Sequence, residues 1–325
     1  MKAIVIREAG GVEVLEVRDV PEPDVSRGEV RVRVRATAVN RADVLQRMGV
    51  YPAPPGSPKD IPGLEFAGEI DAVGDGVSEH APGDHVFGIA GGGTYAEKIV
   101  LPARAVAKMP RGFSFEDAAA IPEAFLTAYD AFDQARLRAG DRVLISAVGS
   151  GVGTAAVQIA RALGARPFGT ARSPEKIERC KKLGLEGGVV PKDGRFADAA
   201  IAMMGGGGAD VIIELAGGDY VTEDLACVAA RGRIVVIGLV AGPQASLPLG
   251  ALLHKRATII GTVLRARPLE EKIRAARMLE RELAPLFEEK KLAPVVDAVL
   301  PLERAREAHE AMQKNETFGK IVLAV

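Results

Sequence analysis

The sequence predicts an α/β protein in which a doubly wound parallel-sheet domain is inserted into a β-rich domain. Short apolar segments separated by turn residues occupy the first 120 residues, and strand and helix patterns alternate from about residue 140 to 240. Such alternation is typical of crossover units, in which helices join parallel strands and cover the sheet. A length of 325 residues is enough for two domains of ordinary size.

The β-rich part begins with two apolar segments, residues 2–7 and 12–17, which flank Gly10-Gly11 and predict a hairpin. Residues 29–38 alternate apolar side chains with arginine, which predicts a strand with one solvent-exposed face. Residues 52–62 contain five prolines and are predicted to form a loop. Further strands are predicted at 68–73, 85–89 and 96–100.

Alanine-rich helices are predicted at 115–120 and 123–136, interrupted at Pro122. Beyond them, strands are predicted at 142–147, 166–170, 188–190, 210–215 and 233–239, and helices at 152–163, 174–183, 195–204 and 221–228. Residues 269–291 predict an amphipathic helical region broken at Pro285, followed by a helix over 301–314 and a strand over 321–325. We expect this C-terminal tail to return to the β-rich domain.

The composition excludes several classes of protein. With 42 basic and 43 acidic residues, the net charge of −1 gives no electrostatic basis for binding nucleic acid or an anionic membrane. The two cysteines, Cys180 and Cys227, exclude a disulfide scaffold and a cysteine-cluster zinc site. They fit a reducing compartment, so we expect a cytoplasmic protein. No apolar stretch reaches the 18 residues or so of a membrane span.

A phosphate-binding turn is predicted where the strand at 142–147 meets the helix at 152–163. Glycine and serine allow close backbone approach, and a helix N-terminus offers free N–H groups and positive partial charge. The strict Gly-x-Gly-x-x-Gly pattern fails, because Val148 and Ser150 occupy its first two positions when Gly153 is third. The strand–turn–helix context still predicts a dinucleotide site, and a turn without ligand is the alternative. Its contact residues are Ser150, Gly151, Val152 and Gly153.

The end of the second strand indicates which dinucleotide is bound. NAD-binding domains carry an acidic residue about 20 positions after the glycines, to bind the ribose 2′-hydroxyl. Here Arg172, Ser173 and Lys176 occupy that region. Cationic side chains form charge-assisted hydrogen bonds with a 2′-phosphate, so we predict NADP(H) rather than NAD(H). Alternatively, Arg172 and Lys176 are solvated residues at a helix start, and Glu175 on the same turn weakens the site.

Several motifs resemble those of a known family: NRAD at 40–43, PGLEFAG at 62–68, AAAIPEAFLTA at 118–128 and SGVGTAA at 150–156. Through them, almost the whole chain resembles the medium-chain dehydrogenase/reductase superfamily, within it the quinone oxidoreductase and zeta-crystallin group, and most closely the p53-inducible type. This resemblance implies a GroES-like catalytic domain (1–122 and 266–325) and a Rossmann NADP-binding domain (123–265). It also implies an NADPH-dependent, zinc-independent reductase that forms a homodimer through edge strands of its Rossmann sheet.

The zinc-dependent branch of the superfamily differs at the ligand positions. It has cysteine near the position of Asn40 and Gly-His-Glu where this chain has Gly63-Leu64-Glu65. Residues 90–105, where a structural zinc lobe would lie, contain no cysteine. The four histidines are scattered, at positions 80, 85, 254 and 309. Catalytic zinc needs about three protein ligands, so we expect no metal site.

Reduction of a quinone without a metal is chemically reasonable, because a quinone is electron-poor and its reduction needs positioning and a hydrogen-bond donor more than a Lewis acid. NADPH would supply the hydride. The resemblance implies that Asn40 contacts substrate or ribose, that Tyr51 donates to the substrate oxygen, and that Thr127 lies near the nicotinamide. Structural alternatives are that Asn40 caps the helix starting at Arg41, Tyr51 packs its loop, and Thr127 bonds back to its helix.

The resemblance also implies cofactor contacts at strand ends and in the C-terminal part: Ala216, Gly238, Val240, Val263, Leu264, Asn315 and Lys320. One departure is Pro191, where relatives often have a tyrosine beside the 2′-phosphate. Two alternative functions remain open, an NADPH-dependent reductase of activated C=C bonds in enones or enoyl thioesters and a nucleotide-binding protein without turnover. The expected partners are a small-molecule quinone or enone and a second copy of the chain, with no nucleic acid or membrane.

Overall fold

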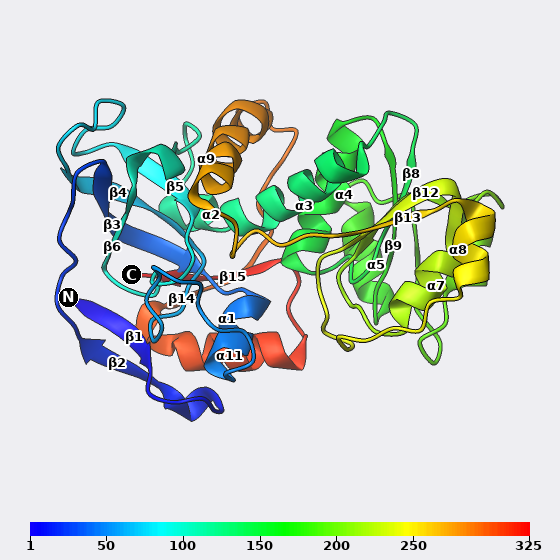
Figure 1. The fold of residues 1–325 in the computed structure, drawn as a ribbon, viewed down its shortest axis with the longest axis horizontal. Helices are drawn as coiled ribbons and strands as arrows, with labels where there is room; N and C mark the ends of the chain where they lie inside the picture. Colours follow the sequence, from blue (N-terminus) through cyan, green and yellow to red (C-terminus); the bar gives the residue numbers. More distant parts are fainter. The chain divides into compact units, whose positions relative to one another are not determined.

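The computed structural model describes residues 1–325 and divides into two compact units (Figure 1). The first unit consists of Met1–Leu126 and Leu264–Val325, and the second of Thr127–Val263. The first unit has a GroES-like architecture and the second a Rossmann-type parallel sheet, as the sequence predicts. That these units are separate domains with boundaries at 122/123 and 265/266 stays a prediction.

The first unit is built on a seven-stranded sheet in the order β14-β15-β3-β4-β5-β7, with β6 also paired to β3. Its strands are β3 (Glu29–Ala38), β4 (Glu65–Val73), β5 (His85–Ile89), β6 (Lys98–Pro102), β7 (Ala107–Lys108), β14 (Val296–Pro301) and β15 (Lys320–Ala324). β1 (Lys2–Ile6) and β2 (Leu15–Asp19) form a separate antiparallel pair. β15 pairs antiparallel with β3, so the predicted return of the C-terminal tail is confirmed.

The alternation in β3 sets the core of this unit. Val30, Val32 and Val34 are buried, whereas Arg33 and Arg35 face solvent, as predicted. The core cluster continues on neighbouring strands through Phe66, Ile70 and Val86. The helices of this unit are α1 (Arg41–Arg47), α2 (Phe115–Ala119), the start of α3 (Pro122–Ala135), α9 (Leu269–Met278), α10 (Ala284–Glu288) and α11 (Ala305–Lys314).

Three local predictions in this unit are wrong. The helix predicted over 301–314 begins at Ala305, because Pro301 ends the unpredicted strand β14 and Leu302–Arg304 form a 3₁₀ turn. Val12–Val14 form a 3₁₀ helix, so the second strand begins at Leu15. The helical region after residue 269 is not broken at Pro285. That proline lies in the first turn of α10, where an amide hydrogen has no acceptor within the helix, and a π-helical turn at Leu279–Leu283 precedes it.

The second unit has a six-stranded parallel sheet in the order β10-β9-β8-β11-β12-β13. Its strands are β8 (Arg142–Ile145), β9 (Arg166–Thr170), β10 (Gly187–Val189), β11 (Ala209–Glu214), β12 (Val228–Val236) and β13 (Thr258–Gly261). Its helices are α4 (Gly151–Ala162), α5 (Pro174–Lys181), α6 (Ala197–Met203), α7 (Tyr220–Cys227) and α8 (Leu249–Lys255), with the larger part of α3.

The strand order reverses direction at β8, because β9 and β10 lie on one side of it and β11 to β13 on the other. In doubly wound sheets, ligands bind beyond the carboxyl ends of the strands at such a switch point. β13 and α8 were not predicted. α8 buries none of its residues, and its sequence therefore lacks the amphipathic pattern that reveals a helix. None of the helices of the structure combines the length and apolar character needed to cross a bilayer.

Candidate active site and nucleotide-binding site

The turn between β8 and α4 forms an open helix N-terminus. Ser150 is the N-cap of α4, and its Oγ accepts a hydrogen bond of 3.1 Å from the Gly153 amide. Its carbonyl accepts one of 2.8 Å from the Thr154 amide. The first N–H groups of a helix have no acceptor within it, so those of Gly151 and Val152 are left for a ligand. This geometry fits the pyrophosphate of a dinucleotide.

Gly153 brings α4 close to the preceding turn. A Cβ atom at this position would lie 2.5 Å from the Val148 carbonyl oxygen and 2.6 Å from that of Ala147. Only glycine fits here without a shift of the backbone. The close approach that the glycine-rich sequence predicts is therefore present, although the hydroxyl of Ser150 is used as a helix cap.

The residues after β9 match the requirements of a 2′-phosphate in part. Arg172 is exposed and forms no ion pair. Ser173 is the N-cap residue of α5, with Pro174 in the first turn. The pKa of Glu175 is lowered by its own backbone N–H and by the Ser173 hydroxyl, so Glu175 is an anion beside the proposed phosphate position. Lys176 is half-buried and has a partner within the protein. Arg172 is thus the uncommitted cation of this segment.

At the end of β11, a buried carboxylate fixes the next turn. Glu214 Oε1 accepts hydrogen bonds from the amides of Ala216 and Gly217, the latter at 2.7 Å. The N–H of Ala216 is therefore already bonded within the protein. Gly238, at the end of the neighbouring strand, packs so closely that a Cβ there would lie 2.2 Å from the Leu215 carbonyl oxygen.

A second buried carboxyl group, that of Asp224, interacts with Glu214. Burial, reinforced by the negative charge of Glu214, raises the pKa of Asp224 well above its ordinary value. Oε2 of Glu214 and both oxygens of Asp224 form no hydrogen bond of ordinary geometry in the structure. A single proton on Asp224, donated to Glu214, would satisfy this pair and leave Glu214 as the acceptor of the turn amides.

The remaining predicted contacts are distributed over both units. Val240 and Val263 are largely exposed in the second unit, whereas Leu264 is buried in the first. Thr127 is buried in α3, and its hydroxyl forms no hydrogen bond back to the helix. Asn315 ends α11 in a left-handed conformation with φ of 58°, and its Oδ1 accepts a hydrogen bond of 2.6 Å from Arg41.

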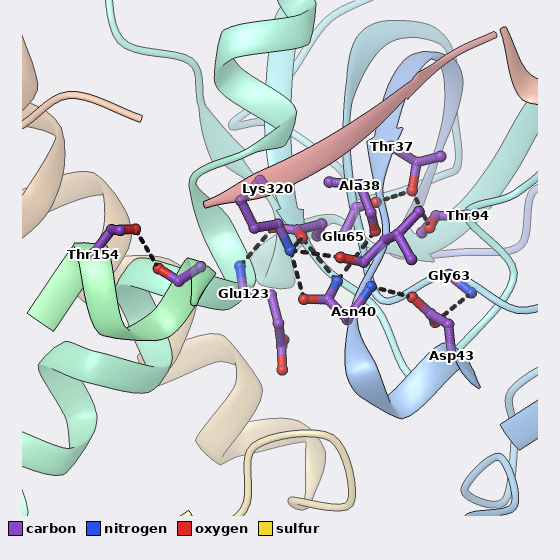
Figure 2. Close-up of polar contacts among 12 residues, drawn as sticks. Thr37, Ala38, Asn40, Asp43, Gly63, Glu65, Thr94, Glu123, Thr154 and Lys320 are labelled. Atoms are coloured by element: carbon purple, nitrogen blue, oxygen red, sulfur yellow. Dashed lines mark hydrogen bonds and ion pairs between the residues drawn. The ribbon is translucent and has the colours of Figure 1, made fainter. Parts of the chain in front are cut away.

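In the first unit, the ends of β3, β4 and β15 bring together a buried polar cluster of Asn40, Glu65 and Lys320 (Figure 2). Glu65 Oε1 lies 2.7 Å from Lys320 Nζ and accepts a hydrogen bond of 2.8 Å from Asn40 Nδ2. Lys320 also donates to Asn40 Oδ1 at 2.6 Å and to the Val39 carbonyl at 3.1 Å. All three donors of Lys320 are in use, so its predicted contact with the cofactor would require one of these bonds to break.

The other oxygen of Glu65 reaches α3. Its Oε2 accepts a hydrogen bond of 2.8 Å from the backbone amide of Glu123. The cluster therefore ties the first turn of α3 to β4. Asn40 also occupies the N-cap position of α1, where its backbone amide donates to Asp43 Oδ2 at 2.8 Å, while its side chain bonds to Glu65 and Lys320.

Asp43 extends the network below the cluster. Its Oδ1 accepts a hydrogen bond of 3.0 Å from Gly63, and its Oδ2 one of 3.4 Å from the Tyr95 hydroxyl. Burial raises the pKa of Asp43 to about 6, although the amides of Asn40 and Gly63 act in the opposite direction. These bonds hold the segment before β4 against α1.

Tyr51 is held by Arg265. The Arg265 side chain is only 4% exposed and donates to the carbonyls of Gly91 and Tyr51, at 2.8 and 3.3 Å, and to Gln46 Oε1. Its guanidinium carbon lies 5.2 Å from the centre of the Tyr51 ring, a cation–π distance. The half-buried Tyr51 has a hydroxyl without a hydrogen-bond partner in the protein. Burial raises the pKa of Tyr51, which keeps its hydroxyl protonated.

Sequence reasoning missed Glu65, Glu123 and Arg265 as parts of this site. A signal was present at Glu65, which lies between the buried apolar residues Leu64 and Phe66. A charged residue in an apolar strand needs a buried partner. Nothing local in the sequence indicates that this partner is Lys320, which lies 255 residues further along the chain.

Comparison with known proteins identifies the family. Residues 26–111 match the alcohol dehydrogenase GroES-like domain, and residues 151–281 match the zinc-binding dehydrogenase family. Quinone oxidoreductase of Rattus norvegicus is 34% identical, over 99% of this chain and 97% of the relative. This chain belongs to the quinone oxidoreductase group of the medium-chain dehydrogenase/reductase superfamily. The predicted family is confirmed, and the protein is an oxidoreductase of this type.

Other relatives show how broad the superfamily is. Pikromycin polyketide synthase component PikAII of Streptomyces venezuelae is 36% identical over 94% of this chain, which matches only 8% of that protein. Among solved structures, Escherichia coli quinone oxidoreductase complexed with NADPH has a TM-score of 0.89 at 28% identity, with both chains fully covered. A structure titled NAD-dependent alcohol dehydrogenase has a TM-score of 0.88 at 37% identity, also with full coverage.

The name of the family that matches residues 151–281, zinc-binding dehydrogenase, raises the question of a metal site. The structure contains no group of three or more histidine, cysteine, aspartate or glutamate side chains that could hold a metal ion. At two positions where the zinc-dependent branch has its ligands, Asn40 and Glu65 bond to each other and to the Lys320 ammonium group.

Proposed function

We propose that this protein is a zinc-independent NADPH:quinone oxidoreductase. The observation that carries the proposal is the pairing of an open α4 N-terminus with the uncommitted Arg172, at the position where NAD-binding domains have an acidic residue. The similarity to rat quinone oxidoreductase supports the substrate class, and the NADPH complex of the Escherichia coli protein supports the cofactor.

The second unit binds the nucleotide in this proposal. The N–H groups of Gly151 and Val152 donate to the pyrophosphate, and Arg172 pairs with the 2′-phosphate. When bound, NADPH supplies the hydride. The N–H of Ala216 is already bonded to Glu214, so this turn contributes through its shape.

The first unit holds the acceptor. The Tyr51 hydroxyl donates a hydrogen bond to the substrate oxygen, and Arg265 fixes the Tyr51 ring. Asn40, held by Glu65 and Lys320, presents a polar surface of defined orientation. The charges of Glu65 and Lys320 neutralise each other. An uncharged substrate can therefore bind next to this pair without facing an unpaired charge.

A reductase of activated C=C bonds is the second candidate. The similarity to a polyketide synthase component favours it. Quinone reduction and C=C reduction both consist of hydride transfer followed by protonation. The two reactions differ in the shape of the molecule that accepts the hydride.

Steady-state oxidation of NADPH with 1,4-benzoquinone, 9,10-phenanthrenequinone and a simple enone tests the proposal. We expect turnover with the quinones and a larger kcat/KM with NADPH than with NADH. Turnover with the enone alone would move the protein to the second candidate. Tight NADPH binding without turnover would identify a binding protein, and equal use of NADH would overturn the cofactor assignment.

We also propose that the protein is a cytoplasmic homodimer. β13 is the edge strand of the parallel sheet, and α8 next to it exposes 63% of Leu249 and 75% of Leu253. Two exposed leucines one turn apart beside a free strand edge favour self-association. Light scattering should give twice the mass of the chain, and Leu253→Glu should shift the protein towards the monomer.

A further inference from the structure

Glu123 stands at the start of α3 with its backbone and side chain in different environments. Its backbone amide donates to the buried Glu65. Its half-buried carboxyl group has no hydrogen bond or ion pair within the protein. Figure 2 shows this side chain directed away from the Glu65–Lys320 pair, with no contact drawn at its carboxyl oxygens. The polar cluster therefore positions Glu123 without using its acidic group.

The charged groups around Glu123 offer it no counter-ion. Lys320 is ion-paired with Glu65 and uses its other donors on Val39 and Asn40. The guanidinium of Arg265 is used by Gly91, Tyr51 and Gln46. An anionic Glu123 would therefore feel the negative charge of Glu65 without an ion-pair partner of its own.

The protonation state of Glu123 follows from these neighbours. Burial, the charge of Glu65 and that of Asp43 raise its pKa, while Lys320 and Arg265 act in the opposite direction, and the result is a pKa of about 8. Glu123 is thus an uncharged acid at neutral pH. When Glu123 is ionised, its charge raises the pKa of Tyr51, so the two groups lie within electrostatic range of each other.

We propose that Glu123 is the general acid that protonates the reduced substrate, an inference that rests on the proposed function. A quinone that has accepted a hydride is a hydroquinone anion, and its oxygen must gain a proton. In this step the O–H bond of Glu123 breaks and a new O–H bond forms on the product. The carboxylate left behind takes a proton from solvent, and the two electrons come with the hydride of NADPH. Tyr51 orients the acceptor, because its raised pKa makes it a weak acid.

The variant Glu123→Gln tests this role, because glutamine keeps the size and the backbone amide but cannot supply the proton. Positioned general acids contribute roughly 10²–10⁴-fold, and we expect a loss of kcat/KM of about 10²-fold with a quinone and a greater loss with an enone, whose enolate is more basic. The fall of kcat/KM above pH about 8 in the wild type should disappear. NADPH affinity, measured by fluorescence titration, should stay unchanged. Glu310→Gln, an exposed glutamate of α11, is the matched control.

Infrared difference spectroscopy at pH 7 provides a readout independent of turnover. The wild type minus Glu123→Gln should show the C=O band of a protonated carboxyl group. Absence of this band, or an unchanged pH profile in an active Glu123→Gln enzyme, would overturn the inference. If the wild type shows the band but reduces no quinone or enone, the proposed function has failed and the general-acid role fails with it, whereas the protonated state of Glu123 stands.

Discussion

Arg172 shows how a single side chain can decide between two cofactors. It lies one residue after Ala171 at the end of β9, is exposed, and has no ion-pair partner. Binding of a phosphate to an unpaired surface guanidinium has a small free-energy cost, because no hydrogen bond within the protein must be broken. The neighbouring Glu175 anion limits this gain.

We therefore predict that Arg172→Ala raises the KM for NADPH about tenfold, which corresponds to the loss of one exposed charge-assisted hydrogen bond. The KM for NADH should not change, since NADH lacks the 2′-phosphate. Arg281→Ala, which removes another exposed arginine, is the control. Equal effects on both nucleotides would remove Arg172 from the phosphate site.

The Glu214–Asp224 pair leads to a prediction on pH. The folded pKa of Asp224 is raised above its unfolded value, so its contribution to stability is present at low pH and is lost as pH rises from about 4 towards the folded pKa. In Asp224→Asn, a neutral side-chain amide can still donate a hydrogen bond to Glu214, and because it does not ionise, stability is not lost as pH rises. Its melting temperature should equal or exceed that of the wild type above pH 5 and depend less on pH.

Asp224→Ala is the contrasting variant, because it removes the donor and leaves Glu214 unsatisfied. It should lose about 1–3 kcal/mol of unfolding free energy in denaturant titrations. If Asp224→Asn were as unstable as Asp224→Ala, Asp224 would be an anion rather than a hydrogen-bond donor.

At the scale of elements, the β8–α4 junction depends on one glycine. Gly153→Ala would place a methyl group against the carbonyls of Val148 and Ala147, whereas Gly250 in α8 has open space around its Cα. Overpacking typically costs about 1–3 kcal/mol. Gly153→Ala should show this loss together with weaker NADPH binding.

Gly250→Ala is a matched substitution within a helix, and it should be neutral or stabilising by about 0.5–1 kcal/mol. Thermal unfolding with and without NADPH measures both variants. Equal stability of the two would mean that α4 can move away from the turn, and the strict need for glycine would be refuted.

The same scale shows why some elements could be predicted and others could not. The alternation of β3 and the turn before α4 are local patterns, and they were interpreted correctly. The π-helical turn at Leu279–Leu283 has no local signature in the sequence, and neither has helix α8, none of whose residues is buried. Packing against distant segments decides both. Pro285 was misinterpreted as a break since proline is tolerated in a first turn.

At the scale of the whole molecule, the Glu65–Lys320 pair joins the C-terminal strand to the N-terminal part of the chain. Lys320 is the first residue of β15, and Glu65 is the first residue of β4. Both side chains are nearly inaccessible to solvent. Removal of one partner of a buried ion pair leaves an uncompensated charge.

Lys320→Met should therefore lower the unfolding free energy by about 3–5 kcal/mol. The double variant Glu65→Gln/Lys320→Met should lose less than Lys320→Met alone, because the remaining glutamine carries no charge. Denaturant unfolding of the two variants and of Glu65→Gln completes a double-mutant cycle. Additive losses would show that the pair contributes no coupling.

The sequence by itself determined the α/β class, the insertion of a parallel-sheet unit into a β-rich one, and the location of the glycine-rich turn between β8 and α4, where phosphate binding stays a prediction. These features depend on periodicity and on strand–turn–helix order, which are properties of neighbouring residues. The candidate contacts Asn40 and Tyr51 came from motifs, and their contact with a substrate stays a prediction.

Only the tertiary structure decided which polar residues meet. Asn40, Glu65, Glu123 and Lys320 come from four distant segments, and their hydrogen bonds exist because β3, β4, α3 and β15 converge. The acidity of Glu123 and Asp224 depends on burial and on neighbouring charges, which no local pattern contains. A sequence specifies its strands through nearby residues, whereas the protonation of a carboxyl group is set by whatever the fold packs around it.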